Sequence, residues 1–240
     1  MAAVGFNWSK LNRKTIIGIV LKCKTSIANV ELTPTQIQKI LSAQIKECLP
    51  IRIVKRLHQI TERGTVYIGG AYYSDLDKSK KIAIELVLQY NPEDKKIIIT
   101  TNKFKNLAKA IADTILHEVI HMRQYRSRKF KFLPNYVSIA ESHKQRVTQN
   151  YLGCPDEIDA YGFNIACELH DKFKGDVSKI VTYLNNPRFI KRKNNWLKYL
   201  EAFDRNHNDP VIRKIKKRTI HYLSYVDLGK PYKTAEWINH

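Results

Sequence analysis

The sequence predicts an α+β fold in which a small antiparallel sheet packs on a long helix and further helices follow. Three observations lead to this class. Strand-like apolar runs are concentrated in 51–101, helix-like apolar spacing dominates after that point, and turn-forming residues separate the runs. The 240 residues are 43% hydrophobic and 27% charged, which is the composition of a globular protein with a sizeable core.

The N-terminal part is expected to combine a basic arm with a first helix. Residues 1–32 are basic and weakly patterned, and their apolar run 16–21 is interpreted as a strand or a short helix. A helix is expected to begin at Thr33, a typical N-cap residue with a proline after it, and to end before Pro50. Its apolar residues recur at helical spacing, which predicts one buried face.

Strands are expected between this helix and residue 101. The runs with strand-like composition are 51–60, 65–73, 81–89 and 96–101. The last two are separated by Asn91-Pro92-Glu93-Asp94, and the turn chemistry of this segment predicts an antiparallel hairpin.

Helices are expected to make up most of the remainder. A long helix follows Asn102, because apolar residues from Leu107 to Met122 fall on one stripe, and another begins at Pro155. Basic helices complete the chain, and one of them is expected to begin with Asp209 as N-cap and Pro210 in its first turn. We therefore divide the sequence into a basic arm (1–32), a core (33–173) and a basic helical C-terminal region (174–240).

Composition argues against several classes of protein. No apolar run approaches the roughly 18 residues of a membrane-spanning helix, so no membrane insertion is expected. The segment 16–21 also lacks the small-residue cleavage site of a signal peptide. The four cysteines have no Cys-x-x-Cys spacing, which argues against a zinc knuckle or a disulfide framework. A reducing, cytoplasmic location is expected, with Cys167 as a small core residue.

The charge balance is strongly positive, because 42 Lys and Arg against 22 Asp and Glu give a net charge of +20. Such a charge favours an anionic partner, such as nucleic acid or another polyanion bound through basic helices. Basic residues cluster between Arg123 and Lys131 and between Arg213 and Arg218. The aromatic residues that could stack on bases are Trp196, Tyr199, Phe203, Tyr222 and Tyr225. The alternative is that these residues form an ordinary amphipathic helix bundle with a solvated charged face.

The segment His117-Glu118-Val119-Ile120-His121 is the most specific motif in the chain. On a helix, residues four apart project from the same face, so the two imidazoles can occupy two positions of one tetrahedral Zn²⁺. Glu118 lies beside them and can accept a proton from water. With eight His residues in the chain, the pattern is expected by chance only ~0.01 times.

This motif, on a helix that follows a sheet, resembles the zincin metallopeptidases. The resemblance implies that His117 and His121 bind zinc, that Glu118 is the catalytic acid–base, and that a third ligand lies downstream. The gluzincin branch uses a glutamate, and Glu157-x-x-Ala160-Tyr161 matches its context. The alternatives for the third ligand are Asp159, Asp156 and His143, the last in the manner of SprT-like proteases. The metzincin extension is absent.

The resemblance also implies a group that donates a hydrogen bond to the oxyanion. Tyr161 and His143 are the first candidates, followed by Tyr125 and Arg123. Gly162 is expected to let its helix approach the metal helix closely. Asp113, one turn before His117, is either an orienting partner of that imidazole or an exposed helix acid.

The expected function is zinc-dependent hydrolysis of a protein or peptide substrate, which would add as an extended strand at the sheet edge. Two alternatives remain open. One is a structural or nucleic-acid-associated protein, such as a phage particle component with an assembly partner, that retains a zincin fold. The other is a SprT-like, DNA-associated protease localised by its positive charge.

Overall fold

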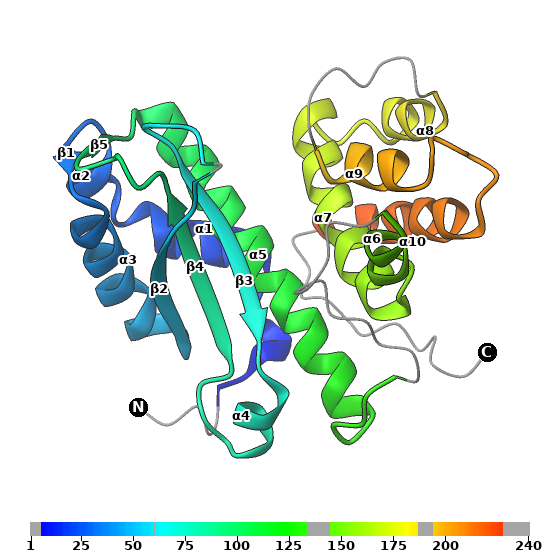
Figure 1. Cartoon of the computed structure of the whole chain (residues 1–240), viewed down its shortest axis with the longest axis horizontal. Coiled ribbons are helices and arrows are strands. Elements are labelled where there is room, and N and C mark those ends of the chain that lie inside the picture. The colour runs from blue at the N-terminus through cyan, green and yellow to red at the C-terminus, as the bar shows by residue number, and fades with distance from the viewer. Residues whose placement is uncertain (1–5, 60, 134–144, 187–193, 228–240) are drawn as a thin grey trace. The chain divides into compact units, whose positions relative to one another are not determined.

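A computed structural model describes residues 6–59, 61–133, 145–186 and 194–227 (Figure 1). The chain divides into two compact units, the first comprising the described residues up to Arg123 and the second those from Gln124 onward. Helices and short sheets are both present, which confirms the α+β class. Among the described helices, none has the length and apolar character needed to cross a bilayer.

The first unit contains the strands and the helices that cover them. Its helices are η1 (Trp8–Lys10), α1 (Arg13–Leu21), α2 (Lys24–Ile27), α3 (Pro34–Cys48), α4 (Ser74–Lys78) and α5 (Thr101–Ser127), and α5 continues into the second unit. Its strands are β1 (Glu31–Leu32), β2 (Ile51–Leu57), β3 (Val66–Tyr72), β4 (Ile84–Tyr90) and β5 (Ile97–Ile98).

The predicted helix after Thr33 is confirmed as α3. The Thr33 side chain accepts a hydrogen bond from the Gln36 backbone, and the Gln36 side chain accepts one from the Thr33 backbone, which completes a capping box. Its buried residues Ile37, Leu41 and Ile45 follow the helical period.

The main sheet has the strand order β2-β4-β3 and is mixed rather than antiparallel. β2 runs parallel to β4, with Ile51 opposite Ile84, whereas β3 runs antiparallel to it. The expected antiparallel sheet is therefore wrong, and so is the hairpin around Asn91, because β5 pairs with β1. The physical reason is that β4 is the central strand, so β2 and β3 already occupy both of its edges.

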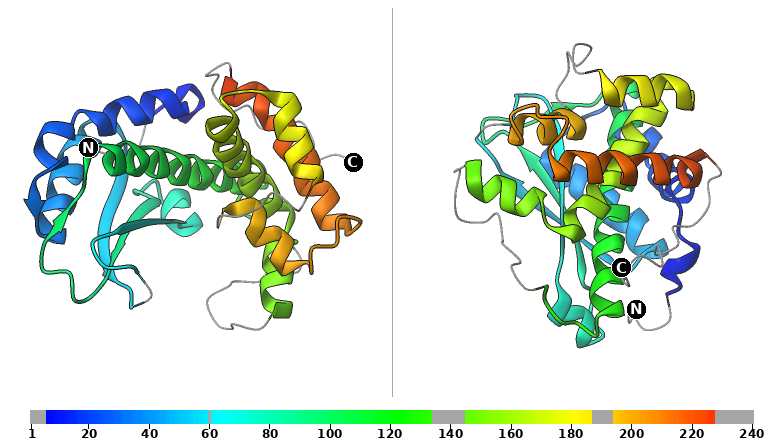
Figure 2. Two further views of the ribbon diagram at one scale, coloured as in Figure 1. Left: turned by 90° about the horizontal axis from the view of Figure 1, so that it is seen from above. Right: turned by 90° about the vertical axis from the view of Figure 1, so that its right-hand side faces the viewer.

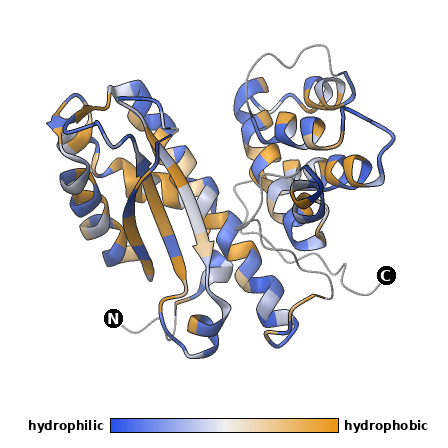
Figure 3. Cartoon of the chain, viewed as in Figure 1, coloured by the Kyte–Doolittle hydropathy of each residue, from blue (hydrophilic) through white to orange (hydrophobic). Residues whose placement is uncertain are grey.

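The segment expected to be an arm contributes to the core of the first unit. Asn12 caps α1 by accepting a hydrogen bond from the Thr15 backbone. Ile16, Val20 and Ile27 are completely buried. The run 16–21 is thus helical, which was one of its two interpretations. Within this unit, α5 lies along one face of the main sheet (Figure 2). The strands and the inner sides of the helices carry most of the hydrophobic residues (Figure 3).

The second unit is helical. It comprises the end of α5, α6 (Gln145–Leu152), α7 (Pro155–Phe173), α8 (Val177–Asn185), α9 (Asn195–Ala202) and α10 (Pro210–Asp227). The predicted starts of α7 at Pro155 and of α10 at Pro210 are confirmed. Cys167 is fully buried in α7 as expected, and all four cysteines are free. The boundary between the units at residue 123 differs from those of the three predicted regions.

Candidate metal centre

The two histidines of the motif project from α5 with their ring nitrogens together. Nε2 of His117 lies 3.1 Å from Nε2 of His121, and the ring planes are inclined by 74°. Two nitrogen ligands of one tetrahedral zinc, each 2.0–2.1 Å from the ion, are about 3.3 Å apart. The pair therefore has the spacing that a shared zinc ion requires.

The position of the motif follows from the amphipathic pattern of α5. Leu116, Val119 and Ile120 are buried on the two sides of the histidines, and His117 itself is 8% exposed. Burying polar groups on such a helix is costly unless they are hydrogen-bonded or bind a ligand.

Glu118 is buried where α5 meets the edge strand β3. This residue is 7% exposed. A Cβ atom built on Gly70 would lie 2.7 Å from Oε1 of Glu118 and 2.9 Å from its Cγ. Only a glycine at this position of β3 leaves room for the carboxylate. Sequence reasoning missed Gly70, although two adjacent glycines inside a strand signal a close approach.

Glu157 lies in the first turn of α7 and is 2% exposed. Among the described residues, His117, His121 and Glu157 form the group of ligand-type side chains that could hold a metal ion, with one atom of each lying within 4.8 Å of the others. Sequence reasoning also missed Tyr151 of α6, which hydrogen-bonds to the Glu157 side chain. Burial, and then the neighbouring Tyr161 and Glu157, raise the pKa of the Tyr151 hydroxyl, so this phenol stays protonated.

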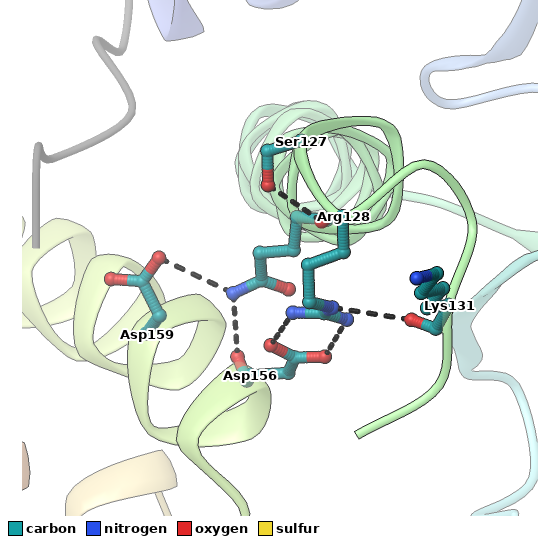
Figure 4. Close-up of polar contacts among 6 residues, drawn as sticks. Ser127, Arg128, Lys131, Asp156 and Asp159 are labelled. Carbon is teal, nitrogen blue, oxygen red and sulfur yellow. Dashed lines mark hydrogen bonds and ion pairs between the residues drawn. The ribbon is translucent and has the colours of Figure 1, made fainter. Parts of the chain in front are cut away.

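The two aspartates that were alternatives for the third ligand are engaged in other interactions (Figure 4). Both oxygens of Asp156 accept hydrogen bonds from Arg128, at 2.7 and 2.6 Å. Asp159 accepts hydrogen bonds from Tyr222 at 2.6 Å and Gln124 at 3.3 Å, and it pairs with Arg218 at 3.0 Å. These carboxylates therefore stabilise the second unit. The remaining alternative, His143, lies outside the described residues.

The candidate oxyanion donors also have partners. The Tyr161 hydroxyl accepts a hydrogen bond of 2.7 Å from Lys198. Arg123 donates to the Trp8 carbonyl at 2.7 Å. Tyr125 is buried, with its ring in edge contact with another aromatic ring. Arg123 and Tyr125 thus contribute to packing.

The structure also shows the surroundings of Asp113 and Gly162. Both carboxylate oxygens of Asp113 accept hydrogen bonds from Arg13 of α1, at 2.6 and 3.0 Å, so this side chain is not an exposed acid. Gly162 contacts α10, where a Cβ atom would lie 2.5 Å from Cγ of Arg218. The expectation that Gly162 serves an approach to the metal helix is therefore wrong.

The basic residues of α10 fall into two groups. Lys216 donates to Asn185 and contacts His207, and Arg218 pairs with Asp159. The exposed members are Arg213, Lys214 and Lys217. The aromatic residues Trp196, Tyr199, Phe203 and Tyr222 are buried, so they pack in the bundle and cannot stack on bases.

Comparison of the chain with protein-family models, with curated proteins and with solved structures found no match. The functional interpretation therefore depends on the residues described above.

Proposed function

We propose that the chain is a zinc-dependent peptidase in which residues 33–173 form a zincin-like core. The observation that carries the proposal is the 3.1 Å spacing of the His117 and His121 Nε2 atoms, with buried Glu118 between them in sequence. A pair of satisfied core histidines would not need a buried carboxylate beside it, whereas hydrolysis requires one.

Glu157 is the proposed third ligand. Its competitors Asp156 and Asp159 are held by arginines, as their short contacts show. Gln124, which follows His121 by three residues on α5, donates to the backbone carbonyl of Asp156 at 3.1 Å, and Glu157 is the next residue. Two histidines and one glutamate leave a fourth coordination position open, which is the donor set of catalytic rather than structural zinc sites.

The residues of the chain have distinct roles in this reaction. Zinc, when bound, polarises the scissile carbonyl and lowers the pKa of water. Glu118 accepts the proton of the attacking water and passes it to the leaving amine. Tyr161, whose hydroxyl accepts from Lys198 and also hydrogen-bonds to Tyr151, is the proposed donor to the oxyanion. The substrate adds as an extended strand along β3, an edge of the main sheet whose Gly70 is exposed.

The test combines metal analysis with substitution of Glu118. We expect one zinc per chain in the wild type, and hydrolysis of labelled casein that is lost on chelation. Glu118→Gln keeps the size of the side chain but cannot accept a proton, so hydrolysis is expected to fall by about 10²–10⁴-fold while zinc is retained. Equal turnover by wild type and variant, or a wild type that neither binds zinc nor cleaves peptides, would refute the proposal.

The exposed basic residues of α10 support a second role, the binding of nucleic acid. Arg213, Lys214 and Lys217 are accessible on the surface of the second unit. Replacing all three with Gln is expected to weaken binding to duplex DNA and to reduce the salt dependence by about 0.9 in log–log slope for each phosphate that is no longer neutralised. Replacing Lys198, an exposed lysine that donates to Tyr161, provides the control. Undetectable DNA binding by the wild type at low salt would exclude this role.

A further inference from the structure

The edge strand β3 contains two adjacent glycines whose surroundings differ sharply. Gly70 faces α5, and a Cβ atom there would lie 2.6 Å from the Thr114 methyl group, 2.7 Å from Oε1 of Glu118 and 2.9 Å from Cγ of Glu118. Separations below 3.0 Å are steric overlaps. At Gly69 the nearest atoms would be Nε2 of Gln89 at 3.5 Å and Cβ of Val87 at 3.8 Å, which are ordinary contacts.

Position 70 therefore requires glycine because a Cβ atom there would overlap with Thr114 and Glu118. The positive φ values of glycines in the described parts of the chain occur at Gly64 and Gly175, and not in β3. Gly70 pairs with Leu86 in a regular antiparallel ladder that an alanine would also fit. In a strand, alanine is even favoured over glycine, because glycine loses more conformational freedom on folding. The missing side chain thus provides the volume that Glu118 and Thr114 occupy.

We propose that Gly70 is a positioning residue that sets the place of the Glu118 carboxylate. Its catalytic consequence depends on the proposed peptidase function, but the contact itself does not. Two of the three close atoms belong to Glu118, and one of them is a carboxylate oxygen. A side chain at position 70 would displace this oxygen from its present position. Proton transfer requires heavy atoms within about 2.6–3.2 Å, so even a small displacement reduces it.

The contact can be tested without any substrate, by a double-mutant cycle on thermal unfolding of the metal-free protein in EDTA. All variants carry Thr114→Ser, which removes the methyl group that also meets position 70. In this background we expect Gly70→Ala to lower the unfolding midpoint by about 4 °C. When Glu118→Ala is also present, Gly70→Ala is expected to lower the unfolding midpoint by less than about half as much, because the Glu118 side chain that it would overlap is gone. Gly69→Ala is the matched control and is expected to leave the midpoint unchanged or slightly raised.

The consequence for activity is tested with labelled casein and zinc analysis. Gly70→Ala in the Thr114→Ser background is expected to keep one zinc per chain and to lose at least about ten-fold in kcat, with little change in KM. In a Glu118→Asp background, whose carboxylate is shorter by one methylene, Gly70→Ala is expected to cause no further loss. Gly18→Ala, at a glycine of α1 with nothing within 4 Å of its added Cβ, is the control and should retain activity.

The outcomes separate the two proposals. Equal unfolding shifts for Gly70→Ala with and without the Glu118 side chain, or equal effects of substitution at positions 69 and 70, would overturn the positioning role. A wild type without hydrolytic activity would refute the proposed peptidase function. The double-mutant cycle on unfolding would still show whether position 70 contacts Glu118.

Discussion

Gly70 in the first unit and Gly162 in the second each lie against a charged side chain, and the two contacts differ in the atoms that surround them. At Gly70 in the first unit, the atoms that a Cβ would meet belong to the ends of the Glu118 and Thr114 side chains. At Gly162 in the second unit, they are Cγ and Cβ of Arg218, with its backbone carbonyl carbon at 3.4 Å. A larger residue would displace a carboxylate in the first case and a helix in the second.

The charged groups in the two places are also used differently. In the second unit, the head of Arg218 pairs with Asp159, which also accepts from Tyr222 and Gln124. This network links α10, α7 and the end of α5. In the first unit, the Nε2 atoms of His117 and His121 lie 3.1 Å apart, and Glu118, next to His117 in sequence, is buried. The network of the second unit stabilises the fold, whereas the histidine pair of the first has the spacing that a shared metal ion would need.

The largest effect on stability is expected from breaking the carboxylate–arginine network. Asp156 and Arg128 form a bidentate pair with side-chain exposures of 5% and 15%. Asp156→Ala leaves the guanidinium without this carboxylate, and we expect a loss of about 3–5 kcal/mol in the free energy of unfolding, measured with denaturant. The control is Asp176→Ala, whose exposed pair with Lys179 should matter much less. A loss at Asp156 no greater than at Asp176 would mean that the network does not hold the unit together.

Gly162→Val tests whether the second glycine serves helix packing. We expect a loss of about 3 kcal/mol, because neither Cβ nor the backbone of Arg218 can move away without separating α10 from α7. Gly18, a glycine of α1 with nothing within 4 Å of its added Cβ, is the matched control. Gly18→Ala is expected to stabilise by about 0.5–1 kcal/mol. Little destabilisation by Gly162→Val would show that packing of α10 on α7 does not require a glycine at this position.

Substitutions of Glu157 and Asp159 test whether these two carboxylates of α7 have separate roles. Glu157→Gln is expected to weaken zinc binding by at least about 100-fold, since substitution of mere outer-shell partners already costs 10–100-fold. Asp159→Asn should retain zinc affinity but lower stability, because it weakens the pairing with Arg218. Competition with a chromophoric chelator measures the affinity. The reverse pattern would move the third ligand to Asp159.

Much of this organisation could be predicted from local sequence. The capping residues Thr33 and Asp209 and the first-turn prolines fixed the starts of α3, α7 and α10, because capping is a short-range interaction. The His117 and His121 pair was also predictable, since helical periodicity alone brings the two rings together. The sequence did not predict which of the acidic residues of α7 pair with arginines, because Arg128 and Arg218 lie far away in sequence.

The pairing of the strands could not be predicted for a similar reason. The turn residues after β4 suggested a hairpin, but β4 is the central strand between β2 and β3. Which strands occupy its edges depends on long-range packing against the helices, and the nearly continuous apolar run in 81–89 does not encode it. The role of Gly70 was hidden because its partner Glu118 is on a helix much later in the chain.

The smallest expected effect is the loss of stability in acid, and we expect it to depend on a histidine of the second unit and not on one of the first. In the second unit, the pKa of His207, which lies near the Trp196 ring, is lowered mainly by burial and also by the positive charge of Lys216. A lowered folded pKa means that the unfolded chain binds the proton more readily, so stability is present above the unfolded value of about 6.5 and declines as pH falls below it. His207→Gln is therefore expected to reduce the drop in unfolding midpoint between pH 7.5 and 5.5, measured in EDTA so that metal loss does not contribute. The exposed His58 of the first unit is the control, and His58→Gln should leave the drop as it is. If both substitutions change the drop equally, the acid sensitivity does not arise from the half-buried His207.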